Sequence, residues 1–170
     1  MMADPRALYQ EVILDHNKQP RNYGSLERPS HHAVGHNPLC GDHIDVELTM
    51  GRAPGCDVAG ESIDAIAFQG AACAICKSSA SMMTMAVKGK TRSEAEVLMH
   101  EFLDMATGKI DLADAHHIGR LRVFSGIRDL PVRVKCAVLP WHTLHAALNA
   151  IENTSTEAEH DPMHTSIGDA

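Results

Sequence analysis

The clearest hydrophobic pattern in the chain is a strict alternation that begins near residue 44. Ile44, Val46 and Leu48 alternate with charged and polar residues, and this two-residue period predicts a half-buried strand. A second strand is predicted over residues 62–69, after a Gly- and Pro-containing turn, and a weaker signal marks residues 31–37. Together these segments predict a small antiparallel sheet.

Helical periodicity dominates the rest of the chain. Helices are predicted over residues 4–15, 79–88, 91–107 and 131–151, with a short helix or turn over 120–128. Thr91 and Glu94 form a capping-box pattern at the start of one helix. Pro140 lies inside the last helix and is predicted to kink or split it.

Length and composition predict one domain with an ordinary core. The chain has 170 residues, of which 44% are hydrophobic, and we assign residues 1–151 to the domain. Residues 152–170 are polar and are expected to be a disordered C-terminal tail. A net charge of −7 and 4% aromatic residues argue against a nucleic-acid partner. No apolar run is long enough for a membrane span, and no membrane partner is expected.

The N-terminal segment carries acidic residues and does not resemble a signal peptide, so the protein is predicted to be cytoplasmic. Five cysteines lie at positions 40, 56, 73, 76 and 136. In a reducing compartment they are expected to bind metal or to react, although buried thiols that act as small hydrophobic groups remain an alternative. The twelve histidines are expected to be mostly solvated or structural.

Four residues could share one metal ion. Cys40 and Asp42 flank a glycine at a turn into the first strand, and residues two apart in an extended segment point the same way. Cys73 lies between a strand and a helix, and Cys136 lies near the start of the last helix, where the helix dipole favours a thiolate. Three thiolates and a carboxylate suit Zn²⁺ or iron–sulfur chemistry, although their spacing matches neither a zinc finger nor a ferredoxin.

Several motifs, in order along the chain, resemble the IscU/NifU-N-terminal family of iron–sulfur cluster assembly proteins. The matching stretches are "LYQEVILDHNKQPRNYG", "NPLCGD", "GAACAICKSSASMM", "VKGKT" and "RVKCAVLPWHTL". An additional stretch around residues 108–130, together with Lys135 before the last cysteine, resembles the SufU branch.

This resemblance implies an α+β fold, SufE/IscU-like, with a three-stranded antiparallel sheet packed against helices. It also implies metal ligands at Cys40, Asp42, Cys73 and Cys136. The resemblance to the SufU branch implies a zinc-bound sulfur acceptor. Such a protein is a zinc-dependent sulfurtransferase that takes sulfur from a pyridoxal-phosphate-dependent cysteine desulfurase (SufS-like). Cys40, in its loop turn, is the expected catalytic acceptor. Other iron–sulfur assembly proteins are the further expected partners.

Two alternatives stay open. The same four ligands could hold an iron–sulfur cluster transiently, which would make the protein a non-enzymatic scaffold. Cys76 forms a C-x-x-C pair with Cys73, as in thiol–disulfide redox modules, although the βαβ pattern of such proteins is missing. We expect Cys76 to point into the helix packing instead.

Overall fold

The computed structural model describes residues 5–52, 61–110 and 117–156. Along the chain the elements are α1 (Pro5–Lys18), β1 (His31–Asn37), β2 (Asp42–Arg52), β3 (Glu61–Gln69), α2 (Ala74–Val87), α3 (Arg92–Ala106), the 3₁₀ helix η2 (Gly119–Ile127), α4 (Pro131–Leu148) and β4 (Asn153–Ser155). The predicted helices and strands are all present, and the weakly signalled strand at 31–37 is confirmed as β1.

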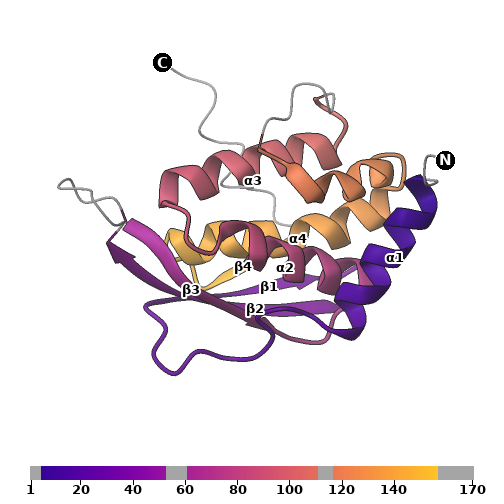
Figure 1. Cartoon of the computed structure of the whole chain (residues 1–170). Helices are drawn as coiled ribbons and strands as arrows, with labels where there is room; N and C mark the ends of the chain where they lie inside the picture. Colours follow the sequence, from indigo (N-terminus) through magenta and orange to yellow (C-terminus); the bar gives the residue numbers. More distant parts are fainter. Residues whose placement is uncertain (1–4, 53–60, 111–116, 157–170) are drawn as a thin grey trace, which may run out of the picture.

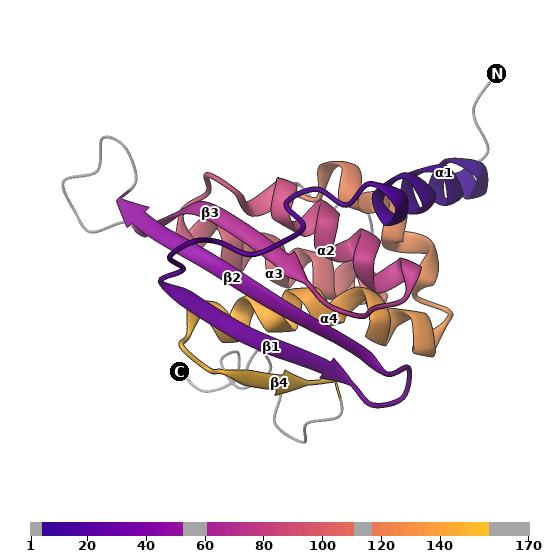
Figure 2. The ribbon, with the colours of Figure 1, turned by 90° about the horizontal axis from the view of Figure 1, so that it is seen from below.

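The sheet has the strand order β3-β2-β1-β4 (Figure 2). Its first three strands are antiparallel, as predicted, and β4 adds a fourth strand parallel to β1. The predicted number of three strands is therefore wrong. β4 is only three residues long, so no periodicity marks it, and it forms where the sequence predicted the start of a tail. The rest of that segment, from residue 157 on, lies outside the described residues.

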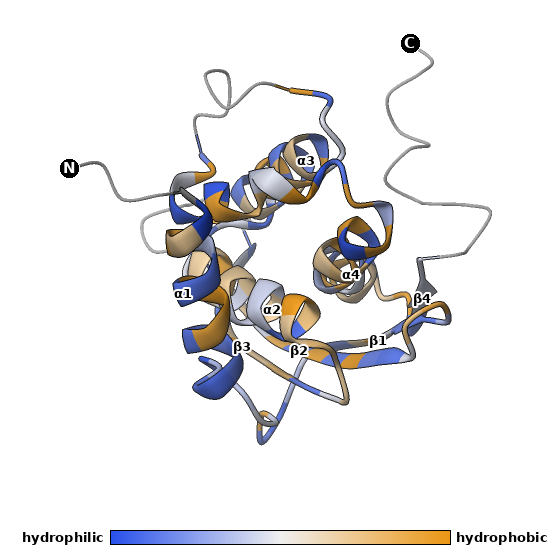
Figure 3. Cartoon of the chain, turned by 90° about the vertical axis from the view of Figure 1, so that its right-hand side faces the viewer, coloured by the Kyte–Doolittle hydropathy of each residue, from blue (hydrophilic) through white to orange (hydrophobic). Residues whose placement is uncertain are grey.

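The helices cover one face of the sheet (Figure 1). In the end-on view of Figure 3, α2 and α4 lie directly above the strands. α3 lies farther from the sheet, above α2 and α4, and α1 lies beside α2. The core between these layers contains Trp141 of α4, which stacks on Phe102 of α3 with ring centroids 4.5 Å apart. The helices among the described residues are all too short or too polar to cross a membrane.

Local signals placed most helix ends correctly. Thr91 and Glu94 form the predicted capping box at the start of α3, with reciprocal side-chain and backbone hydrogen bonds. α2 begins at Ala74, several residues earlier than predicted, because Cys73 caps it. Pro140 does not split α4. Because proline lacks an N–H, the carbonyl of Cys136, four residues earlier, receives no helical hydrogen bond from it.

His16 links α1 to α2 and makes the stability of the fold sensitive to pH. Its Nδ1 lies 2.6 Å from Ser81 Oγ in a buried contact, and burial is the main cause that lowers the pKa of this imidazole, helped by nearby Arg21. The unfolded chain binds this proton at about pH 6.5. The free energy of unfolding is therefore insensitive to this group above that pH, and it falls as the pH drops below it.

We expect His16→Gln to reduce the loss of stability between about pH 6.5 and pH 5. Urea unfolding at several pH values measures this slope, and His32→Gln, which changes an exposed histidine, is the matched control. An unchanged slope in His16→Gln would contradict the assignment.

Candidate metal and sulfur site

The site begins at the hairpin that joins β1 to β2. Cys40 is exposed in the turn, whereas Asp42, the first residue of β2, is 2% exposed. Gly41, between them, has φ +72°, a left-handed conformation that glycine adopts at little cost. Its N–H donates to the carbonyl of Asn37 at 2.8 Å and closes the turn. The turn thus directs one side chain of the pair inward and leaves the other at the surface.

Cys73 reaches the same place from the loop between β3 and α2. This loop packs closely on β2: a Cβ at Gly70 (φ +144°) would lie 2.1 Å from the carbonyl oxygen of His43. The Cys73 N–H donates to Asp42 Oδ1 at 2.8 Å, and its Sγ lies 3.6 Å from Asp42 Oδ2. Cys73 Sγ also caps α2 by accepting the Cys76 N–H at 3.4 Å. Asp42 therefore orients Cys73 through its backbone and contacts its thiol.

Cys136 comes from α4 and completes the group. Its buried Sγ lies 3.5 Å from Cys40 Sγ, and the side-chain amide of Asn37 approaches it at 3.8 Å. The ligand atoms of Cys40, Asp42 and Cys136 all lie within 4.8 Å of one another. The structure thus brings together the four residues that the sequence singled out. Cys40, Asp42 and Cys136 form one compact set, and Cys73 contacts the carboxylate of Asp42.

Two separations within this donor set are close to those of a zinc site. With Zn–S bonds of about 2.3 Å, a tetrahedral ion separates two sulfur ligands by about 3.8 Å, and a sulfur from a carboxylate oxygen by about 3.6 Å. The Cys40–Cys136 and Cys73–Asp42 separations are 3.5 and 3.6 Å. Small side-chain adjustments would therefore let these residues hold Zn²⁺. Soft thiolates also exclude Mg²⁺ and Ca²⁺ as natural occupants.

The thiols at the site differ in acidity. A hydrogen bond from the Cys136 thiol is the main cause that lowers the pKa of Cys73 to about 7, and the backbone N–H of Cys76 contributes. The same hydrogen bond raises the pKa of Cys136, which keeps its proton in this arrangement. Cys73 is therefore the thiol of this pair that ionises first.

The C-x-x-C interpretation finds no support in the geometry. Cys76 is fully buried in the core, as expected from the sequence, and burial raises the pKa of its thiol well above the ordinary value. A thiol in this position is a poor nucleophile and is closed to an external partner. Cys56 lies outside the described residues.

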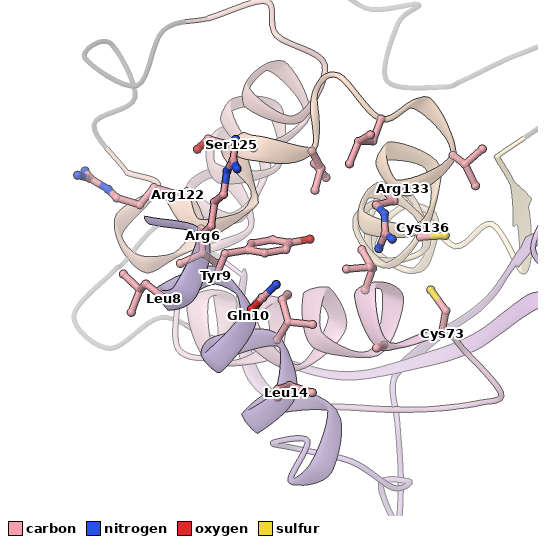
Figure 4. A pocket seen from close by; sticks show the side chains of 18 residues that line it. Arg6, Leu8, Tyr9, Gln10, Leu14, Cys73, Arg122, Ser125, Arg133 and Cys136 are labelled. Atoms are coloured by element: carbon pink, nitrogen blue, oxygen red, sulfur yellow. The ribbon is translucent and has the colours of Figure 1, made fainter. Parts of the chain in front are cut away.

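An open groove adjoins the site and was not predicted from the sequence. It has a volume of about 1300 Å³ and runs between α1, η2 and the first turns of α2 and α4, with Cys73 and Cys136 at one end (Figure 4). Tyr9 projects into it; the hydroxyl of Tyr9 is buried and has no hydrogen-bond partner within the described ranges. Burial raises the pKa of this hydroxyl. Because the lining comes from four separate elements, no local pattern announces the groove.

The groove is apolar with a basic margin. Among the residues that the structure describes, its lining includes three arginines and no acidic residue, although the whole chain carries a net charge of −7. Several large apolar side chains along it are about half exposed, namely Leu8, Leu14, Leu130 and Val132. Leu39, next to Cys40, is 61% exposed. Clustered exposed apolar groups of this kind are typical of a surface that binds another molecule.

Known proteins resemble this chain in both sequence and fold. The family described as "NifU-like N terminal domain" matches residues 8–108. The zinc-dependent sulfurtransferase SufU of Bacillus subtilis (strain 168) is 39% identical over 142 residues, which are 84% of this chain and 90% of that protein. The iron–sulfur cluster assembly scaffold protein IscU of Streptococcus pyogenes serotype M1 is 34% identical and covers 86% of each chain.

A solved structure agrees with this relationship. The crystal structure of an iron–sulfur cluster assembly scaffold protein for the SUF system from Fervidobacterium islandicum AW-1 has a TM-score of 0.73 and 31% identity, covering 84% of this chain and 98% of that one. The matched family model, the two sequence relatives and the shared fold lead to one conclusion. This chain belongs to the NifU-like N-terminal domain family of iron–sulfur cluster assembly proteins, and within that family it resembles the SufU branch.

Proposed function

We propose that this protein is a zinc-dependent sulfurtransferase of iron–sulfur cluster assembly, with Cys40 as the sulfur acceptor. The observation that carries the proposal is the asymmetry of the site. Cys40 is exposed, whereas Cys136 and Asp42, within 4.8 Å of it, are buried. A partner at the surface therefore meets the Cys40 sulfur first.

The transfer step needs no external oxidant or reductant. The Cys40 thiolate attacks the outer sulfur of a cysteine persulfide on the partner, one S–S bond forms while the partner's S–S bond breaks, and the partner's thiolate leaves. Cys40 then carries the persulfide. The attack requires a thiolate, and bound zinc would supply it by keeping its cysteine ligands deprotonated.

The partner that fits this chemistry is a pyridoxal-phosphate-dependent cysteine desulfurase, which forms such a persulfide. The groove supports this assignment because it is continuous with Cys73 and Cys136 at one end. Its exposed apolar side chains offer a hydrophobic contact, and its arginines Arg6, Arg122 and Arg133 favour an acidic margin on the partner. We propose that the persulfide-bearing segment of the desulfurase lies along this groove.

The metal and acid-labile sulfide content of protein purified anaerobically tests the proposal. One zinc per chain without sulfide, lost in Cys73→Ala or Cys136→Ala, is the expected result. Iron and sulfide in near-equal amounts would overturn it in favour of the scaffold function, which the relationship to IscU and the thiolate-rich ligand set also allow.

Asp42 is expected to keep the metal exchangeable. A carboxylate among thiolates is the weakest ligand for a soft ion. The Asp42 carboxylate also accepts a hydrogen bond from the Cys73 N–H, at 2.8 Å. We predict that Asp42→Ala slows the loss of zinc to a competing chelator. Faster metal loss from Asp42→Ala than from the wild type would contradict this role. Asp42→Asn, which keeps an acceptor for the Cys73 N–H, separates the effect on the metal from that on the loop.

The groove makes a second prediction. Val132 lines the groove and is 57% exposed. Replacing it by glutamate would place a charge on the proposed docking surface. We expect Val132→Glu to raise the protein concentration needed for half-maximal stimulation of the desulfurase by about tenfold, because a buried unpaired charge costs more than 1 kcal/mol. Val97→Glu is the matched control, since Val97 is 46% exposed on α3 and does not line the groove. Equal behaviour of the two variants would argue against docking at the groove.

A further inference from the structure

The outer face of the sheet carries a second group of metal-binding side chains that the sulfur chemistry does not use. β1 and β2 pair with His36 directly opposite His43. Both histidines are exposed, because the inward positions of these strands, such as Ile44, fill the core. Asp45 follows two residues after His43 and so points to the same face. Two imidazoles and a carboxylate therefore meet on one patch of the sheet, the His36–His43–Asp45 patch.

We propose that the His36–His43–Asp45 patch is a second Zn²⁺ site, separate from the cysteine site. The rings of His36 and His43 have centroids 6.5 Å apart. Two imidazoles on one tetrahedral zinc place their ring centres about 5 Å apart, given Zn–N bonds of about 2.0 Å. In the structure the ligand atoms of His36, His43 and Asp45 are not all within 4.8 Å of one another. Both histidines are exposed on adjacent strands, so a change of side-chain rotamer would be needed to bring them onto one ion.

His43 and Asp45 lie at the distance of a histidine–carboxylate ion pair, which is also close to the separation of two ligands on one metal ion. His43 Nε2 lies 3.6 Å from Asp45 Oδ1, beyond hydrogen-bond range. A tetrahedral zinc separates a nitrogen and an oxygen ligand by about 3.4 Å. Asp45 Oδ1 is itself buried and has no hydrogen-bond partner in the part of the chain that the structure describes. A cation bound between the two residues would satisfy that oxygen.

Two neighbouring side chains are not available as further ligands. Glu47, the next outward-facing acid on β2, already accepts a hydrogen bond from the Leu26 N–H at 2.6 Å. Val34 of β1 lies opposite Asp45 and offers no ligand. Three protein ligands leave one position for water, so the site is open and exchangeable rather than closed. Imidazole and carboxylate donors suit zinc, and hard cations such as Mg²⁺ compete poorly for imidazole.

The position of the patch ties it to the hairpin of the cysteine site. His43 is adjacent to Asp42 in β2, and the two side chains point to opposite faces of the sheet. A metal bound across β1 and β2 joins the strands at the end of the hairpin that carries Cys40. Because it binds only the folded hairpin, it raises the stability of the fold by mass action. The site is therefore expected to restrain the Cys40 turn from its far side.

Zinc titration of the full chain, already loaded with one zinc, tests the proposal by calorimetry and by thermal unfolding. We expect a second zinc per chain and a rise in Tm as it binds. His36→Gln and His43→Gln should each weaken the second binding step by about tenfold or more, since even residues around metal ligands change affinity by about 10–100-fold. Asp45→Asn should weaken it as well. An excess of Mg²⁺ should leave it unchanged.

Two controls keep the outcome specific. His32→Gln changes an exposed histidine on the same strand, opposite Glu47, and should leave the second step intact. The double variant His160→Gln/His164→Gln removes two histidines of the C-terminal segment and should also leave it intact. Absence of a second zinc, or its retention in both His36→Gln and His43→Gln, overturns the proposal. Neither result bears on the cysteine site, whose zinc is bound before the titration begins.

Discussion

Cys40→Ser should lose sulfur acceptance almost completely while keeping its fold. A serine hydroxyl is not ionised at neutral pH and cannot form a persulfide, so the acceptor is removed rather than weakened. The fold should be unaffected because Cys40 is exposed in a turn. Stimulation of a cysteine desulfurase should fall to the level measured without this protein, and mass spectrometry should find no added sulfur on the variant.

Two comparisons make this result specific to Cys40. Thermal unfolding of Cys40→Ser should stay close to that of the wild type, which excludes misfolding. The zinc content should be compared with that of Cys73→Ala, because Cys40 is expected to serve both as ligand and as acceptor. A Cys40→Ala protein that still turns over in the desulfurase assay would contradict the proposal and would favour a redox role for Cys73 and Cys76.

Trp141→Ala is expected to have the largest effect on stability, about 3–5 kcal/mol in the free energy of unfolding. Trp141 is fully buried and stacks on Phe102 at an interplanar angle of 17°. Its Nε1–H donates to Ser79 Oγ at 3.2 Å, and the Ser79 hydroxyl donates to the carbonyl of Ala137 at 2.6 Å. Truncation therefore opens a large cavity and also removes a donor from a buried polar group.

Urea unfolding monitored by circular dichroism measures this loss. Trp141→Phe keeps most of the ring volume but not the N–H, so it should cost less than Trp141→Ala. Val97→Ala on α3, where the side chain is 46% exposed, is the control and should change stability by less than about 0.5 kcal/mol. A Trp141→Ala protein as stable as Val97→Ala would show that the α3–α4 contact does not hold the core together.

Local sequence patterns predicted the elements of this fold well, because their signals lie within a few residues. The alternation at Ile44, Val46 and Leu48 follows from the geometry of one strand. The capping box of Thr91 and Glu94 depends on residues three apart. β4 escaped prediction because a short edge strand depends on the partner strand that it joins, β1, and not on its own residues.

The candidate site was predicted residue by residue only through the resemblance to a family. Spacing alone did not join Cys136 to Cys40, which are 96 residues apart in the chain. Sequence spacing also did not bring the two histidines of the outer sheet face together. His36 and His43 are separated by a turn and do not form a sequence motif, and only the strand register places them opposite each other.

The sequence by itself determined most of the elements, several of their caps and turns, and the Cys40–Gly41–Asp42 corner, because backbone preferences and hydrophobic periodicity act over short range. Only the tertiary structure decided which thiol is exposed, which carboxylate is buried, and where the groove and the His36–His43–Asp45 patch lie. These properties arise when α4 and the β3–α2 loop pack on β2. Burial and proximity are set by contacts between distant segments, and no local pattern contains them.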